Sequence, residues 1–362
     1  MRERRERKGM LGSELRWLPM SVGSVPHADP QRGCEVVLEH FPQLPTWPQL
    51  PRRTFLENMY VQFSERFPGV VLDMEAERIL VDRSQDLDPA MEQLYTAYQE
   101  NDLDFAAISP EYAAGLAQFP SSLAAHSSLS PVAIKGQVTG PVSWGLTVVD
   151  RDRRPVLYDD VLADALARHL RLKAAWQERE LRKLCPNTII FVDEPYMASF
   201  GSAFVSLQRE QVITLLEEVF DGIEGLKGVH CCGNTDWSLL LATSVDILSF
   251  DTYEYAETLA LYPDDVRAFL DRGGTIAWGI TPQTEAVWEE TVESLVERLH
   301  EVMDLLVRKG VPRDDILAAS MVTPSCGVGT LEEPAAERAL ALTAGVARVM
   351  RERYLGEGSD GY

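Results

Sequence analysis

The sequence predicts a mixed α/β chain, a single (β/α)8 TIM-type barrel with an N-terminal extension. From about residue 100 onward, short apolar runs rich in β-branched residues alternate with long amphipathic runs. This alternation indicates strands and helices of a parallel sheet. Seven or eight such units in roughly 250 residues fit a closed barrel better than an open sheet. With 362 residues, 45% of them hydrophobic, the chain can bury a core of that size.

The expected elements follow one another in a regular order. The strand candidates are 104–109, 132–138, 188–194, 228–232, 247–251, 274–280 and 316–320. The helix candidates between them are 158–184, 208–223, 235–243, 263–271 and 285–309. The last of these helices has apolar residues at helical spacing and basic residues just before Gly310, which is typical of a helix end.

The N-terminal third is less regular. Residues 1–17 are basic and lack an apolar run, so we expect a disordered tail, followed by one barrel over 18–362. A short helix is expected from Gln31 to His40. The proline-rich stretch 41–53 cannot be a regular helix or a central strand, and its length suggests a functional loop or lid. Residues 55–67 are expected to be helical.

Composition excludes several classes of function. The 34 basic and 56 acidic residues give a net charge of −22, which disfavours nucleic acid and an anionic membrane surface as partners. No apolar run approaches the length of a membrane span, so a cytoplasmic protein is expected. The five cysteines are scattered and odd in number, which favours metal or thiol chemistry over a disulfide framework.

Polar side chains gather where the predicted strands end. In a barrel, the chemistry lies at the carboxyl ends of the strands. The residues at these positions are Ser109, 135–137, Asp193, Glu194, 230–232, Asp251, Thr281 and Cys326. Side chains able to bind metal or transfer protons therefore fall where this fold would place an active site.

Three of these residues form a candidate metal site. His230 and Cys232 are two apart at the end of a strand, so both side chains point to the same side and can reach one ion. Cys231 points the other way and is expected in the core. Cys326 lies in a tight loop, TPSCGVGT, that could face the same pocket. Thiolate and imidazole ligands together select zinc.

Several stretches resemble the catalytic C-terminal half of cobalamin-independent methionine synthase. The wider superfamily includes uroporphyrinogen decarboxylase and the methylcobalamin:coenzyme M methyltransferases. The stretches run in the family's order and are SVGSVPHAD (21–29), IKGQVTGPVSW (134–144), IIFVDEP (189–195), VHCCGN (229–234), DILSFDT (246–252), WGITPQT (278–284) and VTPSCGVGT (322–330). The FVDEP and TPSCG segments carry most of the resemblance.

The resemblance implies a barrel with Zn²⁺ in its mouth. It assigns His230, Cys232 and Cys326 as zinc ligands. The family's glutamate ligand is replaced here by Asp251, with Glu254 as the other candidate. Asp193 matches the carboxylate that holds the amino group of homocysteine, and Ser24 matches a contact to its carboxylate.

Two parts of the family pattern are missing. The family enzyme has two barrels, and this chain has room for one. The acidic substrate-binding loop has no clear counterpart, so Glu57 is only a candidate for substrate binding. Because the missing half helps to bind folate, we expect a methylated corrinoid protein to be the methyl donor.

The expected activity is methylation of homocysteine to methionine, with the acceptor held on zinc as a thiolate. One alternative is a coenzyme M-type thiol methyltransferase, although Asp193 favours an acceptor with an amine. Another is a metal-free decarboxylase, which would need basic residues such as Arg52 and Arg53 gathered around a porphyrin. A structural zinc site or an adaptor barrel is the non-enzymatic alternative. Among the other histidines, only His27 is a candidate for the pocket lining.

Overall fold

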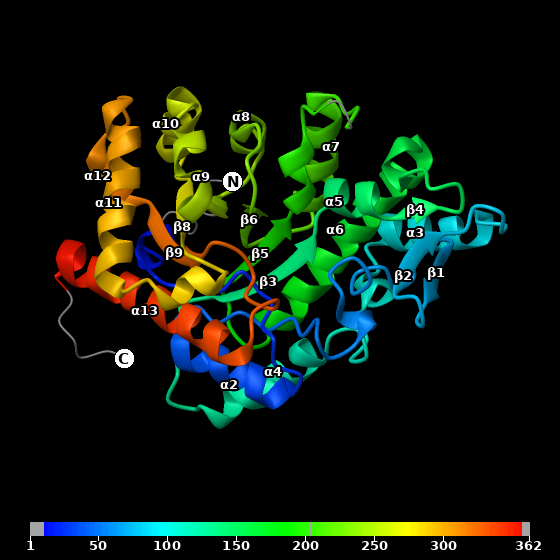
Figure 1. The fold of residues 1–362 in the computed structure, drawn as a ribbon. Helices are drawn as coiled ribbons and strands as arrows, with labels where there is room; N and C mark the ends of the chain where they lie inside the picture. The colour runs from blue at the N-terminus through cyan, green and yellow to red at the C-terminus, as the bar shows by residue number, and fades with distance from the viewer. Residues whose placement is uncertain (1–10, 203–204, 357–362) are drawn as a thin grey trace.

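A parallel sheet of six strands forms the centre of the molecule. The computed structural model describes residues 11–202 and 205–356. The strand order in the sheet is β3-β5-β6-β7-β8-β9, and each neighbouring pair is parallel (Figure 1). The strands are β3 (Ile134–Thr139), β5 (Thr188–Asp193), β6 (Leu226–Cys231), β7 (Ile247–Asp251), β8 (Thr275–Thr281) and β9 (Ser320–Pro324).

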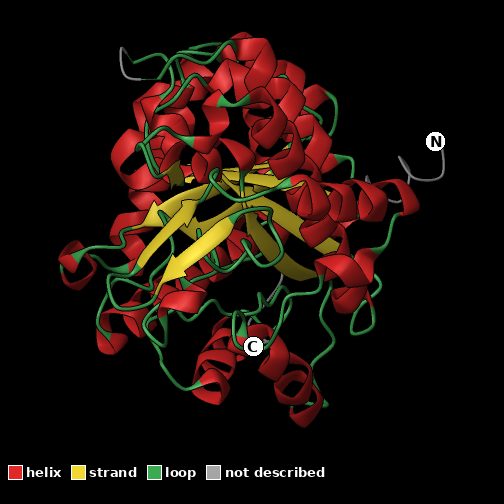
Figure 2. Cartoon of the chain, turned by 90° about the vertical axis from the view of Figure 1, so that its right-hand side faces the viewer, coloured by secondary structure: helices red, strands yellow, loops and turns green. Residues whose placement is uncertain are grey.

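Helices connect successive strands and cover the sheet (Figure 2). The α-helices are α2 (Pro30–His40), α3 (Asp88–Glu100), α4 (Ala114–Ala125), α5 (Pro141–Thr147), α6 (Asp160–Arg182), α7 (Arg209–Phe220), α8 (Trp237–Leu241), α9 (Thr252–Leu259), α10 (Pro263–Asp271), α11 (Val292–Arg308), α12 (Arg313–Ala318) and α13 (Glu333–Leu355). The short 3-10 helices are η1 (Phe55–Glu57), η2 (Leu103–Ala106), η3 (Val156–Tyr158), η4 (Pro195–Ser199) and η5 (Glu285–Trp288).

The sheet separates two hydrophobic cores because successive side chains of a strand point to opposite faces. On β5, Ile190 and Val192 belong to the large core between the sheet and the helices. Ile189 and Phe191 belong to a smaller core on the other side of the sheet. We call this second side the inner face. It is also the side of Leu226, Ile247, Ala277 and Met321.

Two extended segments join the edges of the sheet to each other. Met20 N donates to Val322 O at 2.9 Å beside β9, and Lys135 N donates to Pro45 O at 3.0 Å beside β3. The two segments are themselves bridged in parallel at Ser24 and Gln49. Backbone hydrogen bonds therefore run from β9 through both segments to β3.

The proline-rich stretch 41–53 is one of these joining segments, which corrects the expectation of a lid. Trp47 and Leu50 are fully buried. Its prolines cannot donate backbone hydrogen bonds, so buried glutamines supply links instead. Gln137 Nε2 donates to Trp47 O at 3.3 Å, and Trp47 Nε1 donates to Gln177 Oε1 at 2.9 Å.

Two expectations for the N-terminal half were wrong. Residues 55–67 form only η1 and turns rather than a helix. Residues 104–109 lie partly in η2 and form no strand. A small sheet of β1 (Val70–Asp73), β2 (Arg78–Val81) and β4 (Val149–Asp150) was not foreseen. It lies outside the main sheet, and most of its residues are only partly buried (Figure 1).

Two expectations for the C-terminal half also need correction. The apolar run 316–320 is the end of α12 followed by the start of β9, so one apolar run serves two elements. The predicted helix 285–309 is divided into η5 and α11 because Thr291 caps a new helix, accepting from Ser294 N at 3.2 Å.

The N-terminal extension is only partly described. Residues 1–10 of the expected tail lie outside the described residues. Leu15 and Trp17 are buried, and Leu15 belongs to the inner core. This part of the extension thus covers one end of the inner face. Within the described residues, no helix is both long enough and apolar enough to cross a membrane.

Candidate metal centre

His230 lies on the inner face near the carboxyl end of β6. Ser249 on the neighbouring strand β7 is its partner in register, and the Ser249 hydroxyl lies 3.0 Å from His230 Nδ1. The other ring nitrogen, Nε2, is buried and has no hydrogen-bond partner among the described residues. Because buried polar atoms are normally paired, this nitrogen is a candidate for a metal ligand.

Cys232 and Cys326 complete a cluster with His230. Cys232 follows β6 directly, and Cys326 lies in the loop after β9. One ligand atom from each residue lies within 4.8 Å of the other two. In a tetrahedral zinc site with bonds of about 2.0–2.3 Å, the ligand atoms are about 3.3–3.8 Å apart. The residues present therefore fit a metal ion that prefers nitrogen and sulfur ligands.

The two thiols already interact with each other. A hydrogen bond from Cys326, followed by the nearby His230, lowers the pKa of Cys232. The same bond raises the pKa of Cys326, because the bond holds its proton. The pair thus favours one thiolate beside an imidazole, and both are ligands that a zinc site requires.

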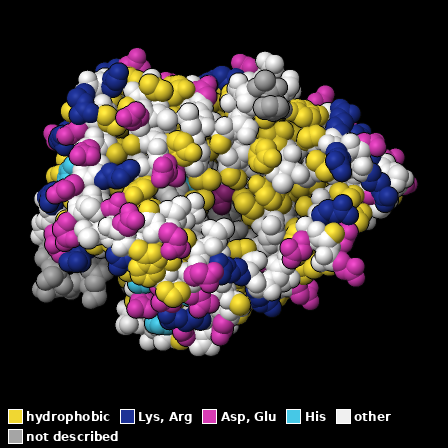
Figure 3. Space-filling model, viewed as in Figure 1, with side chains coloured by type: hydrophobic (Ala, Val, Ile, Leu, Met, Phe, Trp, Pro, Cys, Tyr) yellow, Lys and Arg dark blue, Asp and Glu magenta, His cyan; other side chains and the backbone are white. Residues whose placement is uncertain are grey.

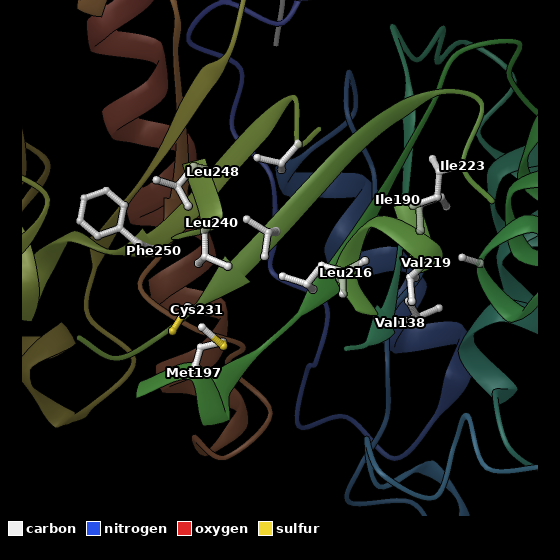
Figure 4. Close-up of a cluster of buried hydrophobic side chains, with 14 of the residues drawn as sticks. Val138, Ile190, Met197, Leu216, Val219, Ile223, Cys231, Leu240, Leu248 and Phe250 are labelled. Carbon is white, nitrogen blue, oxygen red and sulfur yellow. The ribbon is translucent and has the colours of Figure 1, made fainter. Parts of the chain in front are cut away.

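Cys231 lies on the opposite side of β6, as expected from strand alternation. It is fully buried and belongs to the core between the sheet and the helices. Figure 4 shows it beside Met197 in the hydrophobic cluster that includes Phe250. Burial raises the pKa of its thiol to about 12, so Cys231 is a packing residue.

Asp193 ends β5 beside the cluster. It is the register partner of His230, it is buried, and its Oδ1 has no hydrogen-bond partner among the described residues. Burial raises the pKa of the Asp193 carboxyl, while the positive charge of Lys135 and the neighbouring His230 ring oppose that shift. A buried carboxylate oxygen without a partner is suited to accept a hydrogen bond from a ligand.

Asp251 ends β7 and lies near the cluster but is not part of it. Its Oδ1 accepts the backbone N–H of Glu254 at 2.9 Å and thereby caps α9. Burial raises the pKa of Asp251 to about 6. Glu254 lines a groove between α9 and α11. Neither carboxylate joins the group of three ligand atoms.

Ser24 is brought to the loop that carries Cys326. Gly329 N donates to Ser24 Oγ at 3.3 Å, and Val328 N donates to Ser24 O at 3.0 Å. A Cβ on Gly327 would lie 2.2 Å from Ser24 Oγ, so only glycine allows this approach. The two segments therefore pack as one unit beside the cluster.

Glu57 and the two arginines have other partners. Glu57 is buried and accepts from Arg53 Nη1 at 2.9 Å, and it is not part of the cluster. Arg52 donates to the carbonyls of Gly329 and Thr330, at 3.2 and 2.8 Å, and so holds the Cys326 loop. These arginines are not gathered around a pocket for an anion. His27 is also committed elsewhere, since its Nε2 lies 3.2 Å from Glu337 Oε1.

The sequence alone did not identify Glu194 as a support of the site. Its carboxylate accepts from Val142 N at 2.9 Å, and from the backbone and hydroxyl of Ser143 at 2.7 and 2.6 Å. It therefore anchors the start of α5 next to Asp193. The VDEP motif marks this glutamate, but only the fold reveals its partners.

The sequence also did not identify Tyr60 as a neighbour of the cluster. Burial raises the pKa of the Tyr60 hydroxyl, and the negative charges of Glu194 and Cys232 nearby raise it further. Its segment is fixed to the sheet side, because Thr139 Oγ1 donates to Met59 O at 2.6 Å and Trp144 Nε1 donates to Tyr60 O at 2.7 Å. No sequence pattern pointed to this tyrosine, since it lies in turns rather than at a strand end.

The surface over this part of the sheet is hollowed. Figure 3 shows a hollow near the centre of the face seen in Figure 1, over the region of β3, β5 and β6. Hydrophobic side chains gather on one border of the hollow, while acidic and basic side chains are scattered around the rest of the face.

The fold and the site together define a mixed α/β protein with a partly buried His–Cys–Cys group at the carboxyl edge of a parallel sheet. No protein-family model matches the sequence, and no curated protein is significantly similar to it. The fold is similar to that of a B12-independent methionine synthase from Shewanella sp. W3-18-1 in complex with selenomethionine. The TM-score is 0.58 at 16% identity, covering 94% of this chain and 100% of that chain.

A second similar structure is a methyltransferase from Methanosarcina mazei. Its TM-score is 0.53 at 13% identity, covering 94% of this chain and 90% of that chain. At these identities the likeness concerns the fold.

Proposed function

We propose that the protein is a zinc-dependent methyltransferase that methylates the thiol of homocysteine to give methionine. The observation that carries the proposal is the cluster of His230, Cys232 and Cys326, with the unpartnered Nε2 of His230 inside it. Its position at the carboxyl edge of the sheet is where enzymes with parallel α/β folds carry their chemistry. The joined edges of the sheet support a (β/α)8 barrel as the underlying fold.

The three ligands would hold Zn²⁺ and leave a fourth position open. Asp251 remains our candidate for a weak fourth ligand in the free protein, through the carboxylate oxygen that does not cap α9, and the acceptor sulfur would displace it. Zinc bound there would lower the pKa of an incoming thiol and keep its sulfur nucleophilic. The Ser249 hydroxyl fixes the orientation of the His230 ring and thereby directs Nε2 toward the cluster.

The remaining residues would hold the acceptor. Asp193 offers an unpartnered carboxylate oxygen to the amino group of homocysteine, and Ser24 lies beside the Cys326 loop to contact its carboxylate. Two anchoring points and the sulfur fix the acceptor in one orientation, which is catalysis by positioning. The new S–C bond forms as the bond between the donor and its methyl group breaks, with the electron pair leaving on the donor. The thiol proton goes to solvent.

The fold likeness agrees with this proposal. One similar structure is of a methyltransferase, and the other is of a methionine synthase that holds selenomethionine, an analogue of the proposed product. The decarboxylase alternative is disfavoured, because Arg52 holds the Cys326 loop and Arg53 pairs with Glu57.

The methyl donor has two candidates. A methylated corrinoid protein is the donor expected from the sequence. The Shewanella protein, however, is described as B12-independent, and the similarity extends over 100% of its chain. This favours a donor without corrinoid.

The proposal is tested by turnover assays with homocysteine. We expect methionine to form from methylcobalamin, as the simplest model of a corrinoid protein, and to require zinc. Methyl-folate supplied at the same concentration tests the second donor. If zinc-loaded protein forms no methionine from either donor, the proposed function is wrong.

A further inference from the structure

Of the lysines and arginines in the six main strands, only Lys135 lies on the inner face. Lys135 on β3 is fully buried, and its Nζ donates to Val22 O at 2.6 Å and to Gln137 Oε1 at 3.1 Å. The ammonium also lies 4.6 Å from the centre of the Phe191 ring. The other lysine of these strands, Lys227, packs against Phe220 of α7 and lies on the outer side.

A buried ammonium at this place is costly. Burial lowers the pKa of Lys135 to about 8, which reflects the loss of hydration. Neighbouring positions of the inner face are filled by apolar residues such as Ile189 and Phe191. An apolar residue would fill the same space without that cost, so the charge of Lys135 is expected to have a function.

The buried carboxylate of Asp193 is the counterpart of this charge. It ends the neighbouring strand β5, and Lys135 is the largest favourable charge acting on it. The Lys135 ammonium makes its hydrogen bonds to Val22 and Gln137, and Asp193 Oδ1 has no partner among the described residues. The two charges thus attract each other across the inner face.

Lys135 also supports the second anchoring point. Val22, whose carbonyl it holds, is two residues before Ser24 in the segment that joins the edges of the sheet. Ser24 in turn packs against the loop of Cys326. One side chain therefore acts on both parts of the candidate acceptor site.

We propose that Lys135 is a positioning residue that makes the acceptor site select a thiol carrying an α-amino acid group. Its ammonium balances the buried Asp193 carboxylate and leaves Oδ1 free to accept the amino group of the acceptor. Its hydrogen bond to Val22 fixes the segment that carries Ser24. The inference rests on the proposed methyl transfer to homocysteine and adds the origin of its selectivity.

The experiment compares two acceptors in the wild type and in Lys135→Met. Homocysteine carries the amino group, and 4-mercaptobutanoate is the same thiol acid without it. We expect the variant to lose about tenfold or more in the ratio of kcat/KM for homocysteine over 4-mercaptobutanoate. A buried carboxylate without a balancing cation is costly to keep ionised, and a neutral Asp193 attracts the amino group less. The loss should appear mainly as a higher KM for homocysteine, with an unchanged zinc content.

The matched control is Lys173→Met. Lys173 is also fully buried, but it lies on α6, where its Nζ donates to Ala107 O at 3.3 Å. Its removal deletes a buried ammonium away from the acceptor site and should leave the ratio unchanged. If Lys135→Met lowers kcat/KM equally for both thiols, Lys135 only supports the fold and the inference is wrong.

A stability measurement tests the charge pairing without turnover. Lys135→Gln is added as a milder variant, in case the methionine variant fails to fold. Each is combined with Asp193→Asn, and the free energies of unfolding are compared in a double-mutant cycle. We expect the double variants to be more stable than the sum of the single effects, because no unbalanced charge remains. Additive effects would overturn the pairing.

The two experiments separate this inference from the proposed function. Wild-type protein that methylates neither thiol contradicts the proposed function, and the stability cycle then decides on the pairing of Lys135 with Asp193. If the wild type prefers homocysteine and Lys135→Met keeps the same ratio of kcat/KM for the two thiols, only the inference about Lys135 is contradicted.

Discussion

At the scale of single residues, the site depends on strand alternation. His230 and Cys232 face the inner side of the sheet, and Cys231 between them packs into the outer core (Figure 4). The same rule places Asp193 and Asp251 on the inner side near the cluster. The sequence could therefore predict which cysteine faces the site, because a period of two needs only a correctly assigned strand.

Replacing the remote ligand should remove the metal. Cys326→Ala leaves only His230 and Cys232, and we expect the bound zinc to fall from about one per chain to a small fraction of that, because a site needs at least three ligands for tight binding. Cys231→Ala is the matched control and should keep its zinc. Metal analysis of the purified variants by mass spectrometry gives the result. A Cys326→Ala protein with full zinc content would exclude this site.

The partner of the histidine should tune the affinity for metal. Ser249→Ala removes the hydroxyl 3.0 Å from His230 Nδ1, so the ring loses its fixed orientation. Zinc affinity should fall about 10–100-fold, the usual effect of losing such a support. Competition with a chromophoric chelator measures this, with Ser244→Ala, at a hydroxyl paired with Lys227 and Glu217, as control. Equal affinities for the two variants would mean that Ser249 does not orient the ligand.

At the scale of elements, loops rather than strands complete the site. Cys326 reaches the cluster because its loop packs on Ser24 and is held by Arg52. The sequence indicated the tight turn of this loop through its glycines. It could not indicate Arg52, because that contact joins residues 277 or more positions apart and follows no local pattern.

A larger residue at the contact between the Ser24 segment and the Cys326 loop should weaken acceptor binding. Gly327→Ala places a Cβ 2.2 Å from Ser24 Oγ, so the Ser24 hydroxyl must rotate away from its present position or the two segments must separate. We expect the KM for homocysteine to rise about tenfold, with a smaller change in kcat. Gly12→Ala is the control, since a Cβ there meets no atom within 4 Å. Unchanged kinetics in Gly327→Ala would show that the position of Ser24 does not matter for the acceptor.

The helix α6 contains a pH-dependent contribution to stability. Burial lowers the pKa of Lys173 to about 7, whereas the unfolded chain keeps the ordinary value of 10.5. Between these values the unfolded state binds more protons, so the wild type gains stability through this group as the pH rises from about 7 to about 10. Lys173→Met lacks this gain. The free energy of unfolding of the variant should thus exceed that of the wild type by the largest amount at pH 7 or below.

Urea unfolding at pH 6.5 and pH 9 measures the effect. The stability difference between Lys173→Met and the wild type should be larger at pH 6.5, while pH effects of other groups cancel in the difference. A difference that is the same at both pH values would show that Lys173 does not titrate in this range.

At the scale of the whole molecule, the order of most strands and helices was predictable, but the joining of the sheet's two edges by extended segments was not. The strands from β3 to β8 and the helices α6, α7, α8, α10 and α11 follow from regular alternation of apolar runs, whereas α9 was not expected and the last strand was placed too early. The two extended segments that join the edges of the sheet lack that signal. Prolines interrupt one of them, and buried glutamines replace part of its backbone hydrogen bonds. These side-chain links join distant residues, so no local pattern could reveal them.

The same limit applies to the candidate site. The ligands and Asp193 are found from strand ends and motifs, whereas Glu57 was placed from its position in the chain and turned out to pair with Arg53. Lys135 was visible as a charged residue in an apolar strand, but its role depends on Val22 and Asp193 lying beside it.

The central claim is that His230, Cys232 and Cys326 hold a zinc ion that takes the acceptor sulfur. Zinc X-ray absorption spectroscopy of the purified protein, with and without homocysteine, tests it most directly. The account predicts about two sulfur neighbours at about 2.3 Å in the free protein and a third when homocysteine is added. A protein without zinc, or a sulfur count that does not change with homocysteine, would contradict it.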